Sequence, residues 1–294
     1  MLAEPRYHLD KRRMRRGFEQ AAGTYDEAAV LQREVGRRLM DRLDLMRIAP
    51  GCILDAGCGT GEATRALADR YRRSRIVALD IAETMLTRTR SRFPWSRRAQ
   101  VVCGDIEALP FAPGSFDLAF SNLTLQWCND VGAVVSDLRR VIAPHGLLLF
   151  SSLGPDTLAE LRESWRGIDD NTHVNAFVDM HLVGDLLVKN GFSDPVMDME
   201  RITVTFSDLT DLMRDLKAIG AFNHTRGRSR GLTGKGSLEA LKRGYDRFRD
   251  AEGRLPATYE IVYGHAWAPA LSSPRGTPGG GREIKVGFGP RASR

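Results

Sequence analysis

Residues 54–68, LDAGCGTGEATRALA, constrain the fold more than any other stretch of the chain. A short apolar run leads into three glycines at alternate positions, and a helix-like segment follows. Dinucleotide-binding sheets place G-x-G-x-x-G at such a turn to hold a pyrophosphate. Here Gly57, Gly59 and Gly61 form G-x-G-x-G instead, and Asp55 precedes them. Because this carboxylate would repel a phosphate, the turn predicts a cationic ligand that approaches the bare glycine backbone.

The segments around this turn alternate between apolar strands and short helices. This alternation is typical of βαβ units, and strands that are apolar throughout are buried by helices on both faces. The chain is therefore expected to form an α/β fold with a doubly wound, mostly parallel sheet. The predicted strands are CILDA, RIVALD, AQVVCGD, FDLAFSN and GLLLFSS, and the predicted helices lie near 27–46, 61–73, 82–92 and 131–142.

The pattern changes after Leu153. Helices are predicted near 156–168, 178–190, 208–220 and 235–250, and strands at ITVTF (202–206) and TYEIVYG (258–264). The stretch between these two strands is partly polar and glycine-rich, so residues 207–254 are predicted to form a helical insertion on the substrate side. The expected organisation is a basic N-terminal arm (1–17), one domain (18–269) and a disordered tail (270–294).

Composition narrows the setting without identifying a partner. The net charge of +6 suits an acidic partner, although a solvated basic surface is the plainer explanation. The four cysteines lack a CxxC pair or a histidine at metal-ligand spacing, which predicts reduced thiols in a cytoplasmic protein and no metal site. No apolar run approaches the roughly 18 residues of a membrane span. The KRRMRR cluster lacks the apolar core of a secretory signal, and a mitochondrial transit segment stays an alternative.

Acidic residues end three successive predicted strands. Asp55, Asp80 and Asp105 would meet at the sheet edge where doubly wound folds bind their ligands. S-adenosylmethionine fits this edge because it carries an ammonium and a sulfonium and no phosphate. Asp80 is expected to accept the ribose hydroxyls, and Asp105 the adenine amino group with Ile106 packed beside it. Each acid alone is also explained as a strand-end cap.

The motifs LDAGCGTG, ALDIAETML, GDIEALPF and FDLAFSNLTLQW, within residues 53–127, resemble those of class I methyltransferases. The resemblance implies a Rossmann-like sheet with a helical lid and S-adenosylmethionine as the cofactor. It also places Ile81, Met85 and Asn122 at the cofactor, beside the glycines and the three acids.

Nucleic-acid acceptors are not expected. Enzymes that methylate amino groups of DNA and RNA place a D/N/S-P-P-Y/F motif after the fourth strand, whereas this chain has NLTL at 122–125. No Pro-Cys pair is present for attack on cytosine C5. Aromatic residues are also not interleaved with the arginines, as they are in single-strand binding surfaces.

Segments outside these motifs resemble one family closely, the malonyl-acyl carrier protein methyltransferases of biotin synthesis. The resemblance implies methyl transfer to the free carboxylate of a malonyl thioester, delivered on the phosphopantetheine arm of an acyl carrier protein. A carboxylate with a pKa of about 4 is already an anionic nucleophile, so the reaction needs in-line approach and exclusion of water. The resemblance rests on FEQAAGTYDEAAVLQREV (18–35), SNLTLQWCND (121–130), GPDTLAELRESW (154–165), HVNAFVDMHLVGDLL (173–187), MRDLKAIGA (213–221) and GLTGKGSLEAL (231–241).

Three residues in these segments are candidates to contact the acceptor or the reacting methyl. Arg162 offers a planar fork for a carboxylate, although an exposed arginine paired with Glu163 or Asp169 explains it equally well. His173 is more often a satisfied loop histidine than a ligand. The resembling family closes the segment around Tyr25 over the cofactor, so its ring is expected to face the sulfonium and its hydroxyl the carboxylate.

Docking of an acidic carrier protein is the last expectation, and it leaves rivals open. The arginine surface proposed for it comprises Arg33, Arg37, Arg38, Arg226, Arg228 and Lys235. One rival is a small-molecule methyltransferase for a quinone or polyketide. GPDTLAELR and PATYEIVYG also resemble methyltransferase-like assembly factors of respiratory complex I, one of which hydroxylates a protein arginine. A third rival is a regulatory S-adenosylmethionine-binding module without catalysis. No pattern in the sequence decides the oligomeric state.

Overall fold

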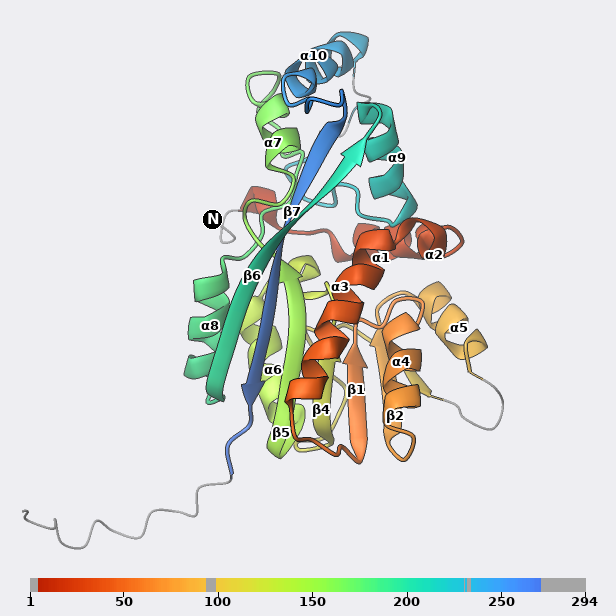
Figure 1. Ribbon diagram of the computed structural model, residues 1–294, viewed down its shortest axis with the longest axis vertical. Coiled ribbons are helices and arrows are strands. Elements are labelled where there is room, and N and C mark those ends of the chain that lie inside the picture. Colours follow the sequence, from red (N-terminus) through yellow and green to blue (C-terminus); the bar gives the residue numbers. More distant parts are fainter. Residues whose placement is uncertain (1–4, 94–98, 230, 232–233, 271–294) are drawn as a thin grey trace, which may run out of the picture.

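Seven strands form one sheet in the order β3-β2-β1-β4-β5-β7-β6 (Figure 1). The computed structural model describes residues 5–93, 99–229, 231 and 234–270. Strands β1 to β5 pair in parallel, and β7 pairs antiparallel with both β5 and β6. The predicted doubly wound, mostly parallel α/β fold is confirmed. The strands are β1 (Cys52–Ala56), β2 (Arg75–Asp80), β3 (Gln100–Cys103), β4 (Phe116–Ser121), β5 (Ile142–Leu153), β6 (Ser193–Phe206) and β7 (Leu255–Trp267).

Helices cover both faces of the sheet. In β1, Ile53 packs into one core cluster with Leu39 and Leu67, whereas the next residue, Leu54, packs into another cluster with Leu187. Successive strand residues point to opposite faces, so the two clusters lie on opposite sides. The helices are η1 (Pro5–Tyr7), α1 (Lys11–Ala21), α2 (Tyr25–Ala28), α3 (Val30–Asp41), η2 (Arg42–Leu45), α4 (Glu62–Arg70), α5 (Glu83–Ser91), η3 (Leu125–Trp127), α6 (Val131–Val141), α7 (Ala159–Trp165), α8 (Met180–Lys189), α9 (Leu209–Ala218) and α10 (Lys235–Asp246).

Two predicted elements differ in extent. The helix expected over 27–46 is divided into α2, α3 and η2. Strand β6 begins at Ser193, well before the predicted start at residue 202, and its residues alternate between exposed and half-buried. It is an edge strand that pairs only with β7, so it accommodates Pro195 where the register shifts. Its acidic exposed residues conceal the strand pattern in the sequence.

Strands β6 and β7 extend past the parallel part of the sheet and carry an upper layer of helices, α7, α9 and α10 (Figure 1). Leu212 of α9, Leu161 of α7 and Tyr245 of α10 join the same core cluster as Tyr259 of β7. The stretch predicted as an insertion, residues 207–254, therefore contributes α9 and α10 to a packed layer. This layer lies beyond the carboxyl ends of β1 and β4.

The predicted boundary at residue 17, between an N-terminal arm and the domain, is wrong. The chain is helical from Lys11, so residue 17 lies inside α1. The Asp10 side chain caps the helix by accepting from the Arg13 backbone N–H at 3.1 Å. Met14, on the inner face of this helix, is buried. Residues 1–4 and 271–294 lie outside the described residues, so the tail expectation lies there as well.

Two findings bear on the setting of the protein. No helix within the described ranges has both the length and the apolar character needed to cross a membrane. All four cysteines are free thiols; Cys103 is exposed, and Cys52, Cys58 and Cys128 are buried.

A buried histidine joins α1 to the upper layer. His224 is 0% exposed, and its Nε2 donates to the Gly220 carbonyl oxygen at 2.9 Å. The ring of Phe222 lies 4.3 Å away, and a Cβ on Gly17 of α1 would come within 2.7 Å of the imidazole. Burial lowers the pKa of His224, so the native protein holds it neutral.

Protonation of His224 is expected to destabilise the fold. The unfolded chain binds this proton near pH 6.5, whereas the native state resists it, so the free energy of unfolding should fall as pH drops below 6.5. Replacing His224 by Phe keeps a ring that cannot titrate and should weaken that decline. Urea unfolding above and below pH 6.5 measures the effect, with His181→Gln as the control at an exposed histidine. An identical decline in His224→Phe and in the wild type would exclude this histidine as the cause.

Candidate functional site

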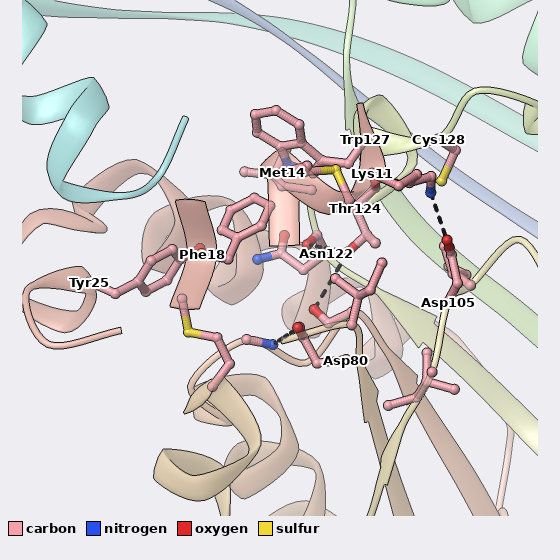
Figure 2. A pocket seen from close by; sticks show the side chains of 18 residues that line it. Lys11, Met14, Phe18, Tyr25, Asp80, Asp105, Asn122, Thr124, Trp127 and Cys128 are labelled. Carbon is pink, nitrogen blue, oxygen red and sulfur yellow. Dashed lines mark hydrogen bonds and ion pairs between the residues drawn. The ribbon is translucent and has the colours of Figure 1, made fainter. Parts of the chain in front are cut away.

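A pocket lies at the carboxyl ends of β1 and β2, next to the point where the sheet order reverses (Figure 2). Ligands of doubly wound sheets bind at this position. We name it the strand-end pocket, and its empty volume is about 620 Å³. Its wall includes Gly57, Gly59, Asp80, Asp105, Asn122 and Trp127.

The glycines of the turn have different roles. Gly57, Gly59 and Gly61 all have positive φ, a conformation that side chains disfavour. A Cβ on Gly57 would lie 2.2 Å from Thr124 Oγ1, and one on Gly61 would lie 2.7 Å from the Thr89 side chain. A Cβ on Gly59 would meet no described atom within 4 Å. Gly57 and Gly61 therefore permit packing, whereas Gly59 leaves bare backbone facing open space.

Asp80 ends β2 and orders the turn. One carboxylate oxygen accepts from the Gly59 backbone N–H at 2.9 Å, and the other accepts from the Ala82 N–H at 2.8 Å. Burial raises the pKa of Asp80, and these two N–H donors oppose that rise. The carboxylate also forms part of the wall of the strand-end pocket. It is thus placed to accept hydroxyl groups from a ligand.

Asp55 lies deeper than the sequence suggested. It was expected at the mouth of the turn, but it is only 1% exposed and accepts the Thr64 hydroxyl at 2.5 Å. Burial, supported by the nearby charge of Asp80, raises the pKa of Asp55 to about 7. Asp55 therefore acts from beneath the turn, and Asp80 supplies the carboxylate in the wall of the strand-end pocket.

Asp105 is engaged by a residue that the sequence analysis left in the arm. Lys11 of α1 lies 3.0 Å from Asp105 and 2.6 Å from Glu107 (Figure 2). Met14 and Phe18, one and two turns further along α1, also line the strand-end pocket. Helix α1 therefore covers the pocket.

The remaining candidates for cofactor binding gather in the same pocket. Ile81, Met85, Ile106 and Asn122 all line it. The Asn122 amide is held on both sides, since it donates to the Gln32 carbonyl at 3.0 Å and accepts the hydroxyl of Ser151 at 2.8 Å. The structure thus brings these residues together with Gly57, Gly59 and Asp80, while Gly61 supports the turn from behind.

A second cavity, the α3–α4 groove, continues from the strand-end pocket. Its empty volume, part of which is open to solvent, is about 1300 Å³; it shares Tyr25, Gly57, Gly59 and Asn122 with that pocket, and Asp55 also lines it. Arg33 lines the groove, and its guanidinium donates to the Asp26 carbonyl oxygen. Arg33, predicted near the cofactor lid as part of a docking surface, thus lies beside the glycine turn.

A third cavity, the upper chamber, lies between the strand-end pocket and the upper layer. Its empty volume, part of which is open to solvent, is about 1180 Å³, and its wall is mainly apolar. It shares Phe18, Tyr25, Leu123 and Trp127 with the strand-end pocket, so these four side chains form the junction of the two cavities. Burial raises the pKa of Tyr25, which keeps its hydroxyl protonated. A position of Tyr25 between donor and acceptor stays a prediction.

His173 also lines the upper chamber, in a fixed orientation. Its ring stacks parallel on Trp165 with centroids 3.5 Å apart, and its Nε2 lies 2.7 Å from Asp169 Oδ1. Asn175, two residues further on, lines the chamber as well. The contacts of His173 are those of a satisfied loop histidine whose ring face borders the chamber.

Arg162 does not form part of the chamber wall, which corrects the expectation of a carboxylate clamp. Its side chain is exposed on α7 and turns back to donate to the Pro155 and Thr157 carbonyl oxygens at 3.0 and 2.9 Å. Both guanidinium ends are used on backbone. The pairing suggested with Glu163 or Asp169 is also replaced by these contacts.

Sequence reasoning missed several residues of the site. Lys11, Met14 and Phe18 went unassigned because their segment is rich in arginine, although Asp10 followed by apolar residues one turn apart is the pattern of a capped amphipathic helix. Asn175 lies in the HVNAF segment, but no residue spacing distinguishes it.

Comparisons with known proteins agree with this geometry. Residues 54–150 match a family model described as a methyltransferase domain. Among solved structures, the YcgJ protein of Bacillus subtilis superposes with a TM-score of 0.57 at 14% identity, over 79% of this chain and 97% of that one. Phosphoethanolamine N-methyltransferase 2 of Haemonchus contortus gives 0.53 at 15% identity, over 85% and 57%. At such identities these likenesses show the fold alone.

Three curated relatives are much closer in sequence. They come from Methylovorus sp. (51% identical, 98% of this chain and 97% of the relative), Gallionella capsiferriformans (49%, 95% and 97%) and Laribacter hongkongensis (50%, 97% and 98%). Each is named malonyl-[acyl-carrier protein] O-methyltransferase. The identity extends over the upper layer as well as the parallel sheet, so the chain belongs to the malonyl-[acyl-carrier protein] O-methyltransferase family.

Proposed function

We propose that this protein transfers the methyl group of S-adenosylmethionine to the free carboxylate of malonyl-acyl carrier protein. The observation that carries the proposal is the junction at Tyr25, where a strand-end pocket with Asp80 and bare Gly59 meets a mainly apolar chamber. The names of relatives that align over nearly the whole chain support the same acceptor. They do not favour the complex I assembly factor or a small-molecule acceptor.

The strand-end pocket and the α3–α4 groove suit the donor. The Asp80 carboxylate is placed to accept the ribose hydroxyls, and Ile81 and Ile106 supply apolar contact for the purine. Bare backbone at Gly59 permits close approach of the methionine portion. Arg33, within the groove, offers a cation for the carboxylate of the donor. The Lys11 ammonium is paired with the Asp105 carboxylate. For Asp105 also to contact the adenine amino group, the ammonium and the amino group must share this carboxylate.

The junction of the cavities suits the transfer step. The bound donor supplies an electrophilic methyl on a sulfonium, and the malonyl carboxylate attacks it without help from a base. Phe18, Trp127 and Tyr25 surround this point with aromatic faces, which attract a cation. Opposite charges cancel as the bond forms, so an apolar, water-poor wall favours the transition state over the separated ions.

The direct test uses purified protein with S-adenosylmethionine and malonyl-acyl carrier protein. Mass spectrometry should show one added methyl on the malonyl group, and the gene should restore growth without biotin to a strain that lacks its malonyl methyltransferase. Malonyl methyl ester on the same carrier is the control, since its carboxylate is blocked. A protein that binds S-adenosylmethionine but leaves malonyl-acyl carrier protein unmodified would contradict the proposal.

The glycine turn yields a second prediction. Gly59→Ala should fold, at a cost of about 1–2 kcal/mol for its positive φ, and bind S-adenosylmethionine at least tenfold more weakly because the new methyl blocks the ligand's approach. Gly57→Ala should lower the melting temperature more than Gly59→Ala does, since its Cβ would also overlap Thr124. Calorimetric titration and thermal unfolding separate the two effects. Wild-type affinity in Gly59→Ala would remove that glycine from the binding surface.

Arginines beside the upper chamber offer the better docking surface for an acidic carrier. Arg37 and Arg38, predicted for this role, are each paired with Glu34. Arg226 and Arg228 flank Asp10, whose pKa is lowered chiefly by the Arg13 N–H and also by these two charges. Their loop joins the N-terminal segment through a bridge between Leu9 and Thr225. We infer that the acidic carrier protein docks at this loop. We also infer that the protein is cytoplasmic, where such carriers and free thiols occur.

Salt should reveal this docking surface. If exposed arginines receive the carrier, the KM for malonyl-acyl carrier protein should rise with ionic strength more than the KM for malonyl-pantetheine, which lacks the protein. Replacing both Arg226 and Arg228 by Ser should raise the carrier KM about fivefold with kcat unchanged, at roughly 0.5 kcal/mol for each exposed charge. Arg65→Ser, on α4, is the control. Equal salt responses for both substrates would count against the surface.

A further inference from the structure

One buried polar atom, on a residue that lines the upper chamber, has no partner. Asn175 is only 8% exposed and lines the chamber, and its carboxamide oxygen Oδ1 makes no hydrogen bond to any described residue. A buried acceptor without a donor is costly, and native structures seldom retain one without a role. The atom therefore marks a place where a ligand with a hydrogen-bond donor is expected.

Neighbouring amides in the same wall are already satisfied. Gln126 donates to the Leu123 carbonyl at 2.6 Å, and Asn223 donates to the Thr172 carbonyl. The Asn223 oxygen also accepts from the backbone and hydroxyl of Thr225, at 2.9 and 2.8 Å. These amides hold the chamber wall together, whereas the Asn175 oxygen has no such task.

The segment that carries Asn175 is held firmly. The Thr172 backbone N–H donates to the Gly227 carbonyl at 3.0 Å, and His173 is stacked on Trp165. Asn175 is thus presented from an anchored loop, which limits the entropy lost when a ligand binds.

The chemistry of the acceptor indicates which part of it pairs with Asn175. The malonyl group offers only oxygen acceptors, namely an ionised carboxylate and a thioester carbonyl. The pantetheine arm behind the sulfur carries secondary amides, each with an N–H donor. An unpaired carbonyl oxygen in an apolar wall matches an amide N–H and does not match a carboxylate.

We propose that Asn175 Oδ1 accepts the amide N–H of the pantetheine arm nearest the thioester, and that this contact positions the malonyl group toward the junction at Tyr25. The inference rests on the proposed function, because it takes a malonyl thioester as the acceptor. It assigns recognition of the arm to the chamber and recognition of the carrier to the arginines outside.

Two small thioesters test the contact. Malonyl-N-acetylcysteamine carries the amide, and malonyl S-pentyl thioester replaces it with methylenes at the same length. Wild-type protein should show a kcat/KM about tenfold higher for the amide substrate, as one hydrogen bond to a buried acceptor allows. Asn175→Leu should bring this ratio close to one, mainly through loss on the amide substrate. Asn175→Asp keeps an acceptor oxygen and should retain the preference. Both thioesters carry the same malonyl charge, so any repulsion from the new carboxylate affects both substrates and cancels in the ratio of their kcat/KM values.

Each outcome of this test is decisive. Asn190→Leu, outside the chamber, is the matched control and should leave the ratio unchanged. Equal losses on both thioesters in Asn175→Leu, or no preference in the wild type, would overturn the assignment. Asn175 would then have a structural role, with its side-chain oxygen hydrated in the free protein. If Asn175→Leu fails to fold, loss of the preference in Asn175→Asp would overturn it as well. If wild-type protein methylates neither thioester nor the malonyl carrier, the proposed function fails instead.

Discussion

The structure depends on the attachment of the glycine turn to the end of β2. The Asp80 carboxylate holds the Gly59 N–H, and the backbone N–H groups of Gly57 and Cys58 both donate to the Leu79 carbonyl. Three bonds therefore fix the loop after β1 to its neighbouring strand, and helix α4 begins directly beyond it. The walls of the strand-end pocket and of the α3–α4 groove both include Gly57 and Gly59 of this turn, and the junction with the upper chamber lies next to it. A shift of the turn would displace every wall that meets the reacting groups.

The parallel half of the fold could be predicted from the sequence because its physical signals are local. Apolar strands, short helices and strand-end acids repeat within a few residues, so Asp80, Asp105 and Ile106 were predicted at one edge of the sheet, where all three line the strand-end pocket. Helix α1 and the first half of strand β6 were missed because they depend on tertiary contacts. Met14 of α1 is buried against a pocket formed by distant segments, and β6, among the described residues, pairs with only one strand. Burial likewise placed Asp55 beneath the turn.

The charged residues show the same limit of sequence reasoning. An arginine in a helix near the acceptor looks like a carboxylate clamp, yet the backbone turn before α7 offers Arg162 two carbonyl oxygens at closer range. Arg37 and Arg38 likewise find acids one turn away. Local partners take up these charges and leave these three arginines less available for recognition of a ligand. Neutral groups, such as the amide of Asn175, then carry the finer discrimination inside the chamber.

The long β6–β7 pair has a consequence for how such proteins diversify. Helix α9, which forms part of the chamber wall, is inserted between β7 and the edge strand β6, whereas most donor contacts come from loops of the parallel strands. An exchange of the stretch between Phe206 and Leu255 would replace the part of the chamber wall that residues 213–223 supply, without interrupting a single parallel pairing. That part of the acceptor wall can therefore change by recombination at a single hairpin while the donor-binding loops keep their strand pairing.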